Sequence, residues 1–349
     1  MRRLTVLLCV ICVSLACHSP APSSGQWHEL YKAHQWFELR AAAASHSTSV
    51  LESAAVAAAF NDAEQAEKQL RAVIATTPHS EDAYEALELL TYVFMLSGSY
   101  HRALEQDEAM LAARPDDASA RNAYALLAAL SHYPDQAVTQ RRSSRVRYRL
   151  DDGNLFLPVS IGGKAATYML DSGANFSTMS ESEAKRHGLT IHDVGAKGQD
   201  ATGGDVAFRL AVAEQVTVGE VKLANVAFLI IGDDQQPFAG SPQEERGILG
   251  LPVLLAMETV RWDQQGNFDL GFAGGAKNLS SANLCFDGAD LVAEAFVQDR
   301  RVSLVLDTGA SDTRLWPPFA RNFPALIASV DKKDKTKVEG VAHTRSWSQ

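Results

Sequence analysis

Two short stretches decide the fold of this 349-residue chain. Residues 167–177 read TYMLDSGANFS, and residues 303–311 read SLVLDTGAS. In each, an aspartate follows an apolar run and precedes a small hydroxyl residue, a glycine and an alanine. Asp171 and Asp307 therefore occupy the same place in two copies, 136 residues apart. A single Asp-Ser-Gly would indicate an Asx turn, but two copies in matched surroundings indicate a duplicated unit.

The sequence around both aspartates has a β-type pattern. After Val146, short apolar runs alternate with Gly, Asp and Asn, which predicts strands. The runs cover residues 155–161, 166–170, 206–218, 226–231 and 268–272. One short helix is expected at residues 181–187. This part of the chain is therefore predicted to be an all-β, barrel-like region.

The repeated motif resembles the aspartic peptidases of the retropepsin and pepsin clan, in which Asp-Thr/Ser-Gly lies at the base of two related lobes. The first copy also has the clan's later element, two aliphatic residues and a glycine, at residues 248–250, after a flap-like hairpin at residues 198–208. The resemblance implies an acid-protease-like closed β-barrel lobe at residues 151–275. A partial second lobe is expected at residues 284–349, because no counterpart of residues 248–250 follows Asp307.

The partial second lobe leaves three interpretations open. The sequence is a truncated product of a longer gene, or two first lobes pair as a homodimer with two Asp171 carboxylates, or catalysis is lost and a peptide-binding cleft is kept. In the family, the strand at residues 248–250 supports the aspartate turn. Without it, Asp307 is expected to be poorly held.

Paired carboxylates indicate acid–base chemistry on water. Two carboxyl groups within about 3 Å cannot both ionise cheaply, so they share one proton over a range of acidic pH. The charged group would take a proton from a water that attacks a peptide carbonyl, and the protonated group would donate to the developing oxyanion. We therefore expect Asp171 and Asp307 to be the catalytic residues of an endopeptidase acting on extended polypeptide. No metal or organic cofactor is required. The alternative is a non-catalytic peptide-binding or scaffold protein with a degenerate or truncated protease fold.

The other predicted site residues surround the two aspartates. By resemblance, the hydroxyls of the motif hydrogen-bond across the lobes, and its glycines permit tight turns and close substrate approach. These supporting residues are Ser172, Gly173, Thr308 and Gly309. The predicted substrate-binding residues are Ala174, Ala310, Gly203 and Gly204.

Residues 27–140 are predicted to form a helical, repeat-like domain, which makes the whole chain an α + all-β multidomain protein. Apolar residues recur there at helical spacing, and a shift of 37 residues aligns two copies. The turn at residues 97–100, with the later Pro115, resembles a tetratricopeptide repeat, whose stacked helices form a concave surface for a protein partner. A plain helical bundle is the alternative. Residues 141–150, which carry five arginines, are expected to be a basic linker.

The N-terminus has the pattern of a secretory signal over residues 1–16, with Arg2, Arg3 and an apolar run. Residues 14–17 read SLAC and resemble a bacterial lipoprotein signal, which implies lipidation of Cys17, a flexible linker at residues 17–26 and a periplasmic protein. By the same resemblance, His18 favours the outer membrane, with the lipid as the only membrane contact. A soluble exported protein is the alternative. The net charge of −10 argues against a nucleic-acid partner.

Overall fold

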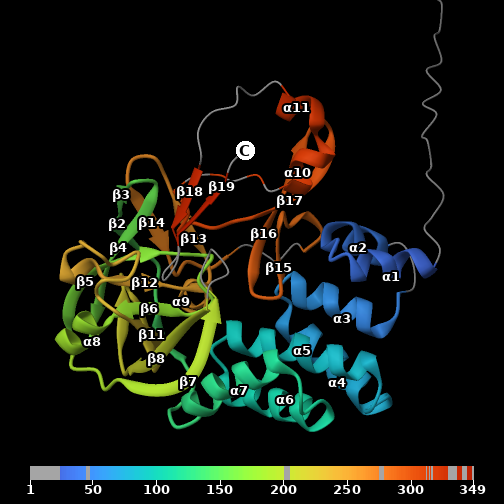
Figure 1. The fold of residues 1–349 in the computed structure, drawn as a ribbon, viewed down its shortest axis with the longest axis horizontal. Helices are drawn as coiled ribbons and strands as arrows, with labels where there is room; N and C mark the ends of the chain where they lie inside the picture. Colours follow the sequence, from blue (N-terminus) through green and yellow to red (C-terminus); the bar gives the residue numbers. More distant parts are fainter. Residues whose placement is uncertain are drawn as a thin grey trace, which may run out of the picture.

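The computed structural model describes residues 24–44, 48–199, 205–274, 279–311, 313, 315, 317–328, 336–339 and 344–347. The predicted signal, Cys17, most of the predicted linker, Gly203 and Gly204 lie outside these ranges. A helical region comes first, and a β region follows it (Figure 1). Among the described residues, no helix is both long enough and apolar enough to cross a membrane.

The helical region is built from antiparallel helix pairs. Side-chain caps fix several starts: Ser49 forms a capping box with Glu52, and Asp62, Ser80 and Asp117 each accept a backbone amide of the first turn. The helices are α1 (Ser24–Lys32), α2 (Trp36–Ala43), α3 (Val50–Ala59), α4 (Ala63–Thr76), α5 (Glu81–Leu96), α6 (Tyr100–Ala113) and α7 (Ala118–Leu130).

The 37-residue shift predicted from the sequence is present in the helix starts. Helix α4 begins at residue 63 and α6 at residue 100, while α5 and α7 begin at residues 81 and 118. Both pairs are therefore offset by 37 residues. The second helix pair repeats the first, and the assignment to tetratricopeptide repeats stays a prediction.

The β region is dominated by an 11-stranded sheet whose order is β1-β10-β9-β4-β5-β12-β6-β11-β8-β7, with β3 paired to β4. Its strands are β1 (Ala137–Arg141), β3 (Arg149–Asp151), β4 (Asn154–Ile161), β5 (Lys164–Leu170), β6 (Ser177–Ser180), β7 (His192–Gln199), β8 (Asp205–Ala213), β9 (Val216–Val218), β10 (Val221–Ala224), β11 (Val226–Ile231) and β12 (Gly247–Leu249). Helices α8 (Glu181–His187) and α9 (Leu251–Ala256) interrupt the strands, and β13 (Val260–Trp262) and β14 (Asn267–Leu270) pair with β2 (Ser144–Arg147). The short helix expected at residues 181–187 is confirmed.

The expected closed barrel is wrong in one respect: the sheet is curled but open. Among the described residues, its end strands β1 and β7 do not pair with each other. Instead, β7 lies against α7, where the amide of Lys197 donates to Asn122 at 2.9 Å. The helical region thus protects an edge that barrel closure would otherwise remove.

The basic linker expected at residues 141–150 is also wrong, because this stretch contains the end of β1, then β2 and most of β3. Its arginines pair with acids on neighbouring segments: Arg141 with Glu258, Arg145 with Asp269, and Arg149 with Glu245. The charged side chains lie at the surface of strands. The arginine-rich composition of this stretch therefore did not indicate its β structure.

The second copy repeats the first without a gap. Its elements are β15 (Leu284–Asp287), β16 (Asp290–Val297), β17 (Arg300–Val305), α10 (Pro317–Asn322), α11 (Pro324–Ala328), β18 (Thr336–Glu339) and β19 (Thr344–Trp347). Phe156 pairs with Met169 in the first copy, and Val292 pairs with Val305 in the second. Each residue of the second pair lies 136 positions after its equivalent, as Asp307 does after Asp171, and α10 begins 136 positions after α8.

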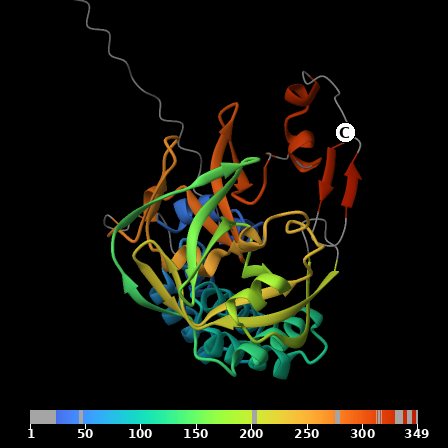
Figure 2. The same cartoon turned by 90° about the vertical axis from the view of Figure 1, so that its left-hand side faces the viewer.

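Helices and sheet share one hydrophobic core. Leu127 and Leu130 of α7 pack in the same cluster as Leu210 of β8 and Leu229 of β11. A second cluster fills the inside of the curled sheet, around Tyr168 and Phe228. Figure 1 shows the helices to the right of the curled sheet, with α7 beside β7 and the second-copy strands β15 to β17 above α3, and Figure 2 shows the same arrangement from the side of the sheet. The two regions therefore form one packed unit.

Candidate active site

The two aspartate loops are held together by reciprocal hydrogen bonds. The hydroxyl of Ser172 donates to the carbonyl of Leu306 at 2.6 Å, and the hydroxyl of Thr308 donates to the carbonyl of Leu170 at 2.7 Å. The amide of Ser172 donates to the Thr308 hydroxyl at 3.0 Å, and the amide of Thr308 donates to the Ser172 hydroxyl at 3.1 Å. Each hydroxyl is therefore both donor and acceptor, and the two loops are related by an approximate two-fold axis.

This geometry places the carboxyl groups of Asp171 and Asp307 side by side. An amide of the same loop donates to each: Gly173 to Asp171 at 2.8 Å, and Gly309 to Asp307 at 2.9 Å. A Cβ atom on Gly309 would lie 2.5 Å from Cγ of Asp171, and one on Gly173 would lie 2.8 Å from Cγ of Asp307. Each glycine thus packs on the opposite carboxyl group, where no side chain fits.

Asp307 is better held than the short second copy predicts. The first copy supplies its support, because the Ser172 hydroxyl fixes the residue before Asp307 and the Ser172 amide binds the residue after it. In addition, Gly153 in the turn before β4 approaches the backbone of Ser311, where an added Cβ would lie 3.1 Å from the carbonyl oxygen. Residues of the first copy therefore supply part of the support of the Asp307 loop.

The carboxyl groups differ in their surroundings. Asp171 is half-buried and Asp307 is exposed. Burial, and next the negative charge of Asp307, raise the pKa of Asp171 to about 7, against the opposing hydrogen bond from the Gly173 amide. Because the two groups are adjacent, the proton belongs to the pair. One carboxylate and one carboxylic acid, open to solvent, are the groups that acid–base chemistry on water needs.

An apolar wall stands beside the Asp171 loop. It consists of Met169, Val206, Ile231, Phe238 and Ile248, with Ala174, Phe156 and Phe208 packed against it. Ala174 thus lies between the Asp171 loop and this wall, Ala310 follows Gly309 in the second loop, and the substrate-binding role of both stays a prediction. Strand β8 contributes to the wall from the flap-like hairpin, although the tip with Gly203 and Gly204 lies outside the described residues.

Sequence reasoning missed three supporting groups. Gly153 could have been found from the Asp-Gly turn signal at residues 152–153. Phe238 lies in a long loop, and no sequence signal indicated that it is buried. The third is a buried network on α8, where Glu183 binds Arg186, His187 and the Tyr168 hydroxyl.

The Glu183 network fixes α8 against β5, the strand that leads to Asp171. The side chains of Glu183 and His187 are both fully buried. Burial would raise the pKa of Glu183, but the hydrogen bonds from Arg186 and His187 outweigh it and lower the pKa to about 2. Among the described residues, no cluster of His, Cys, Asp and Glu could hold a metal ion.

Residues 157–253 match the family model described as aspartyl protease. The match runs from β4 into α9 and includes Asp171, and it ends before Asp307. The part of the β region around Asp171 is therefore similar to aspartyl proteases.

Two solved structures are similar to parts of the chain. A retropepsin-like aspartic protease from Rickettsia conorii is 15% identical with a TM-score of 0.28, covering 38% of this chain and 94% of that one. The retroviral protease-like domain of Ddi1 from Leishmania major is 23% identical with a TM-score of 0.22, covering 32% of this chain and 84% of that one. No curated protein matches the sequence.

Proposed function

We propose that this protein is an aspartic endopeptidase whose dyad consists of Asp171 and Asp307 of one chain. The observation that carries the proposal is the reciprocal bonding of Ser172 and Thr308, which brings the two carboxyl groups together. A lone Asp-Ser-Gly turn has no such constraint. A second copy of the chain is not needed to supply the other carboxylate, in contrast to the homodimer alternative.

The proposed reaction is hydrolysis of a peptide bond. The ionised member of the dyad takes a proton from water, whose oxygen then bonds to the peptide carbonyl carbon. The protonated member donates to the carbonyl oxygen as negative charge develops there. When the tetrahedral intermediate collapses, the carbon–nitrogen bond breaks, the nitrogen takes a proton from the dyad, and one hydroxyl group of the intermediate returns a proton to the dyad. The products are a carboxylic acid and an amine, and the dyad again holds one proton.

The proposed substrate is an extended polypeptide lying between the aspartate loops and the β7–β8 hairpin. Support comes from Phe156 and Phe208, which are partly buried on the apolar wall around Phe238 and offer a surface for an apolar side chain of the substrate. A substrate in this place has to be extended, with a rise of about 3.3 Å per residue, and a folded protein does not offer such a free segment. Unstructured proteins are therefore the proposed substrate class.

Cleavage of an unstructured protein such as reduced casein, by the purified chain between pH 3 and 8, tests the proposal. Asp171→Asn and Asp307→Asn should each abolish cleavage, because one carboxylate cannot act as acid and base together. Asp299→Asn is the matched control, since Asp299 lies in the exposed β16–β17 turn with a positive φ that Asn tolerates.

Mixing the two inactive variants separates a dyad within one chain from a dyad between chains. For a dyad within one chain, the mixture stays inactive. If Asp307→Asn keeps full activity while Asp171→Asn loses it, pairing of two Asp171 residues is the better account. A fully inactive parent protein would leave peptide binding by a degenerate protease fold as the function.

Export and lipid anchoring are part of the proposal and rest on the sequence of residues 1–17. Incorporation of labelled palmitate in a bacterial host, lost in Cys17→Ser, is the expected result. Palmitate-free export would favour the soluble form.

The repeat of α4–α5 in α6–α7 supports a protein partner on the helical region.

A further inference from the structure

The two aspartate loops have unequal support from their own copies. In the first copy, the carbonyl of Leu249 on β12 accepts from the amide of Asp171 at 3.0 Å, and the amide of Leu251 donates to Ala174 at 2.9 Å. Strand β5 is thus paired on both sides, with β4 and β12. Within the described residues, its equivalent β17 pairs with β16 alone. The strand that leads to Asp171 therefore has a neighbour on each side. The strand that leads to Asp307 has one described neighbour, in a sheet of only three strands, and a sheet this small needs further packing to be stable.

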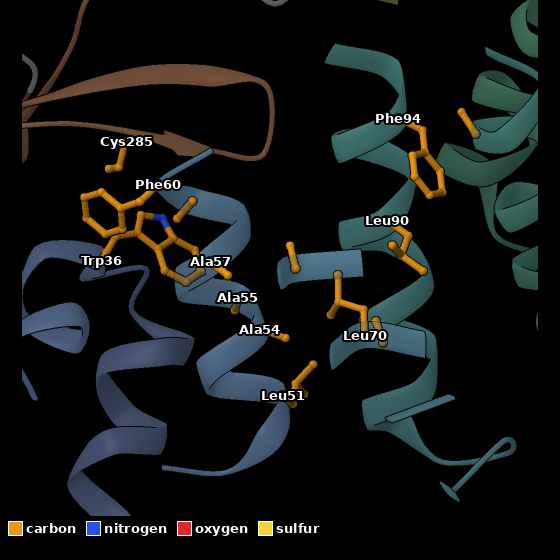
Figure 3. Packing of buried hydrophobic residues seen from close by; sticks show 14 of the residues in the cluster. Trp36, Leu51, Ala54, Ala55, Ala57, Phe60, Leu70, Leu90, Phe94 and Cys285 are labelled. Carbon is orange, nitrogen blue, oxygen red and sulfur yellow. The ribbon is translucent and has the colours of Figure 1, made fainter. Parts of the chain in front are cut away.

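The helical region supplies apolar cover for this small sheet. Cys285 of β15 and Val292 of β16 are buried in the same cluster as Trp36 and Phe60. Figure 3 shows Cys285 directly above the rings of Phe60 and Trp36, between the hairpin and the helices. Burial also raises the pKa of the Cys285 thiol to about 12. The packing therefore resembles the core of one domain.

Polar contacts fix the position of the sheet on the helices. The indole N–H of Trp36 donates to Oδ1 of Asp287 at 3.1 Å, and Nδ1 of His34 lies 2.6 Å from the same oxygen. Arg40 donates to the carbonyl of Ala282 at 2.7 Å. Trp36 and Arg40 belong to α2, and His34 lies two residues before it. This short helix therefore contacts the chain at both ends of β15.

A continuous hydrogen-bonded path connects this anchor to the second aspartate. Strand β15 pairs with β16, and β16 pairs with β17. At the end of β17, the amide of Leu306 donates to the carbonyl of Leu291 at 2.7 Å, one residue before Asp307. A shift of β15 on the helices would therefore be transmitted to the Asp307 loop.

The same helical region contacts the first loop. Tyr100, the first residue of α6, stacks on Phe176, five residues after Asp171, with ring centroids 5.8 Å apart and planes inclined by 27°. Both aspartate loops are thus positioned against one helical body.

We propose that the helical region gives the sheet of β15, β16 and β17 the support that β12 gives to β5, and so positions Asp307 against Asp171, with Trp36 as the positioning residue. This rests on the proposed peptidase function for its kinetic consequence. Its structural consequence, that release of β15 from α2 separates the carboxyl groups, does not require activity.

Two variants of the full chain test the proposal. Trp36→Phe keeps an aromatic ring but removes the N–H donor, and Asp287→Ala removes the acceptor at a half-buried position, outside the core. Trp262→Phe is the matched control, since Trp262 lies on β13 and stacks on Phe268 of the first lobe. The readouts are the rate of thiol labelling at Cys285, located by peptide mapping, and the titration of Asp171 followed by its 13C carboxyl resonance.

We expect Cys285 to label about tenfold faster in both variants, since each loses a hydrogen bond to a charged group. The titration midpoint of Asp171 should fall, because the charge of Asp307 moves away. With an unstructured substrate, kcat and kcat/KM should fall equally, as expected for an interaction made in the transition state. The double variant should be no worse than Asp287→Ala, because that variant already lacks the Trp36–Asp287 hydrogen bond.

Two results would overturn the proposal. One is faster labelling of Cys285 with an unchanged Asp171 titration, which would show that docking of the hairpin does not position Asp307. The other is unchanged labelling in both variants, which would show that this contact does not hold the hairpin. If the parent protein cleaves nothing, the peptidase function fails, but labelling and titration still decide the positioning role.

Discussion

Ser172 and Thr308 exchange hydrogen bonds across 136 residues of sequence, the amide of each donating to the hydroxyl of the other at 3.0 and 3.1 Å. Each hydroxyl also donates to a backbone carbonyl of the other copy, Ser172 to Leu306 and Thr308 to Leu170. The pair therefore makes the two copies of the aspartate loop dependent on each other, and any function of the carboxyl groups depends on this contact.

Removing one of these hydroxyls should lower both activity and stability. In Ser172→Ala the carbonyl of Leu306 and the amide of Thr308 lose their partner, which costs about 1–3 kcal/mol. We expect urea unfolding to shift by that amount and cleavage to fall about tenfold or more.

Two further variants control this experiment. Thr308→Ser keeps the hydroxyl and should retain activity, whereas Thr308→Val should behave like Ser172→Ala. Ser303→Ala, at an exposed position on β17, should change nothing. Equal activity of Thr308→Val and Thr308→Ser would contradict the role of the hydroxyl.

Gly309→Ala should abolish cleavage, because the new Cβ would lie 2.5 Å from the Asp171 carboxyl carbon. The comparison is Gly163→Ala, where φ is +83° but no atom lies within 4 Å of the added Cβ. That variant should lose about 1 kcal/mol of stability through backbone strain and keep its kcat. Thermal unfolding and kcat, measured on both, separate the two effects, and an active Gly309→Ala would argue against the observed packing of the dyad.

Much of this site follows from the sequence, and the reason is the duplication. A pattern of apolar run, aspartate, hydroxyl and glycine encodes a local turn, and its repetition at one spacing encodes a pair. The sequence does not encode where the remaining support comes from. The contacts of Trp36 with Asp287 and of Tyr100 with Phe176 join residues that are far apart, and single residues on helices carry no local sign of them.

The arginine-rich stretch at residues 141–150 shows a second limit. Charge and β propensity gave opposite indications there, and pairing with Asp269, Glu258 and Glu245 decided in favour of strands. Tertiary partners override composition wherever charges at the surface of a sheet meet opposite charges.

The pH dependence of the dyad follows from the raised pKa of Asp171, to about 7. An unfolded aspartate loses its proton near pH 3.9, so between about pH 4 and 7 the folded chain binds more protons than the unfolded one. Stability contributed by this group therefore falls as pH rises through that window. Cleavage should decline above about pH 7, when the last shared proton leaves. In Asp307→Asn the midpoint of Asp171 should move to lower pH, and an unchanged midpoint would contradict the coupling.

The Glu183 network should give stability with the opposite dependence on pH. The pKa of Glu183 is lowered from 4.5 to about 2, mainly through Arg186 and His187 acting against burial, and its side chain is fully buried. A folded-state pKa below the unfolded value means that the stabilisation is present above about pH 4.5 and is lost as pH falls towards 2. The shift corresponds to roughly 3 kcal/mol.

Glu183→Gln should therefore lower the free energy of unfolding at pH 6 and remove its decline between pH 4.5 and 2. Glu181→Gln, on the same helix but only half-buried and paired with Lys185 and Arg209, is the control and should cost less than about 1 kcal/mol. Urea unfolding of the three proteins at pH 6, 4 and 3 measures both effects. A decline that persists in Glu183→Gln would assign the acid sensitivity to another group and leave the network as a packing element behind Asp171.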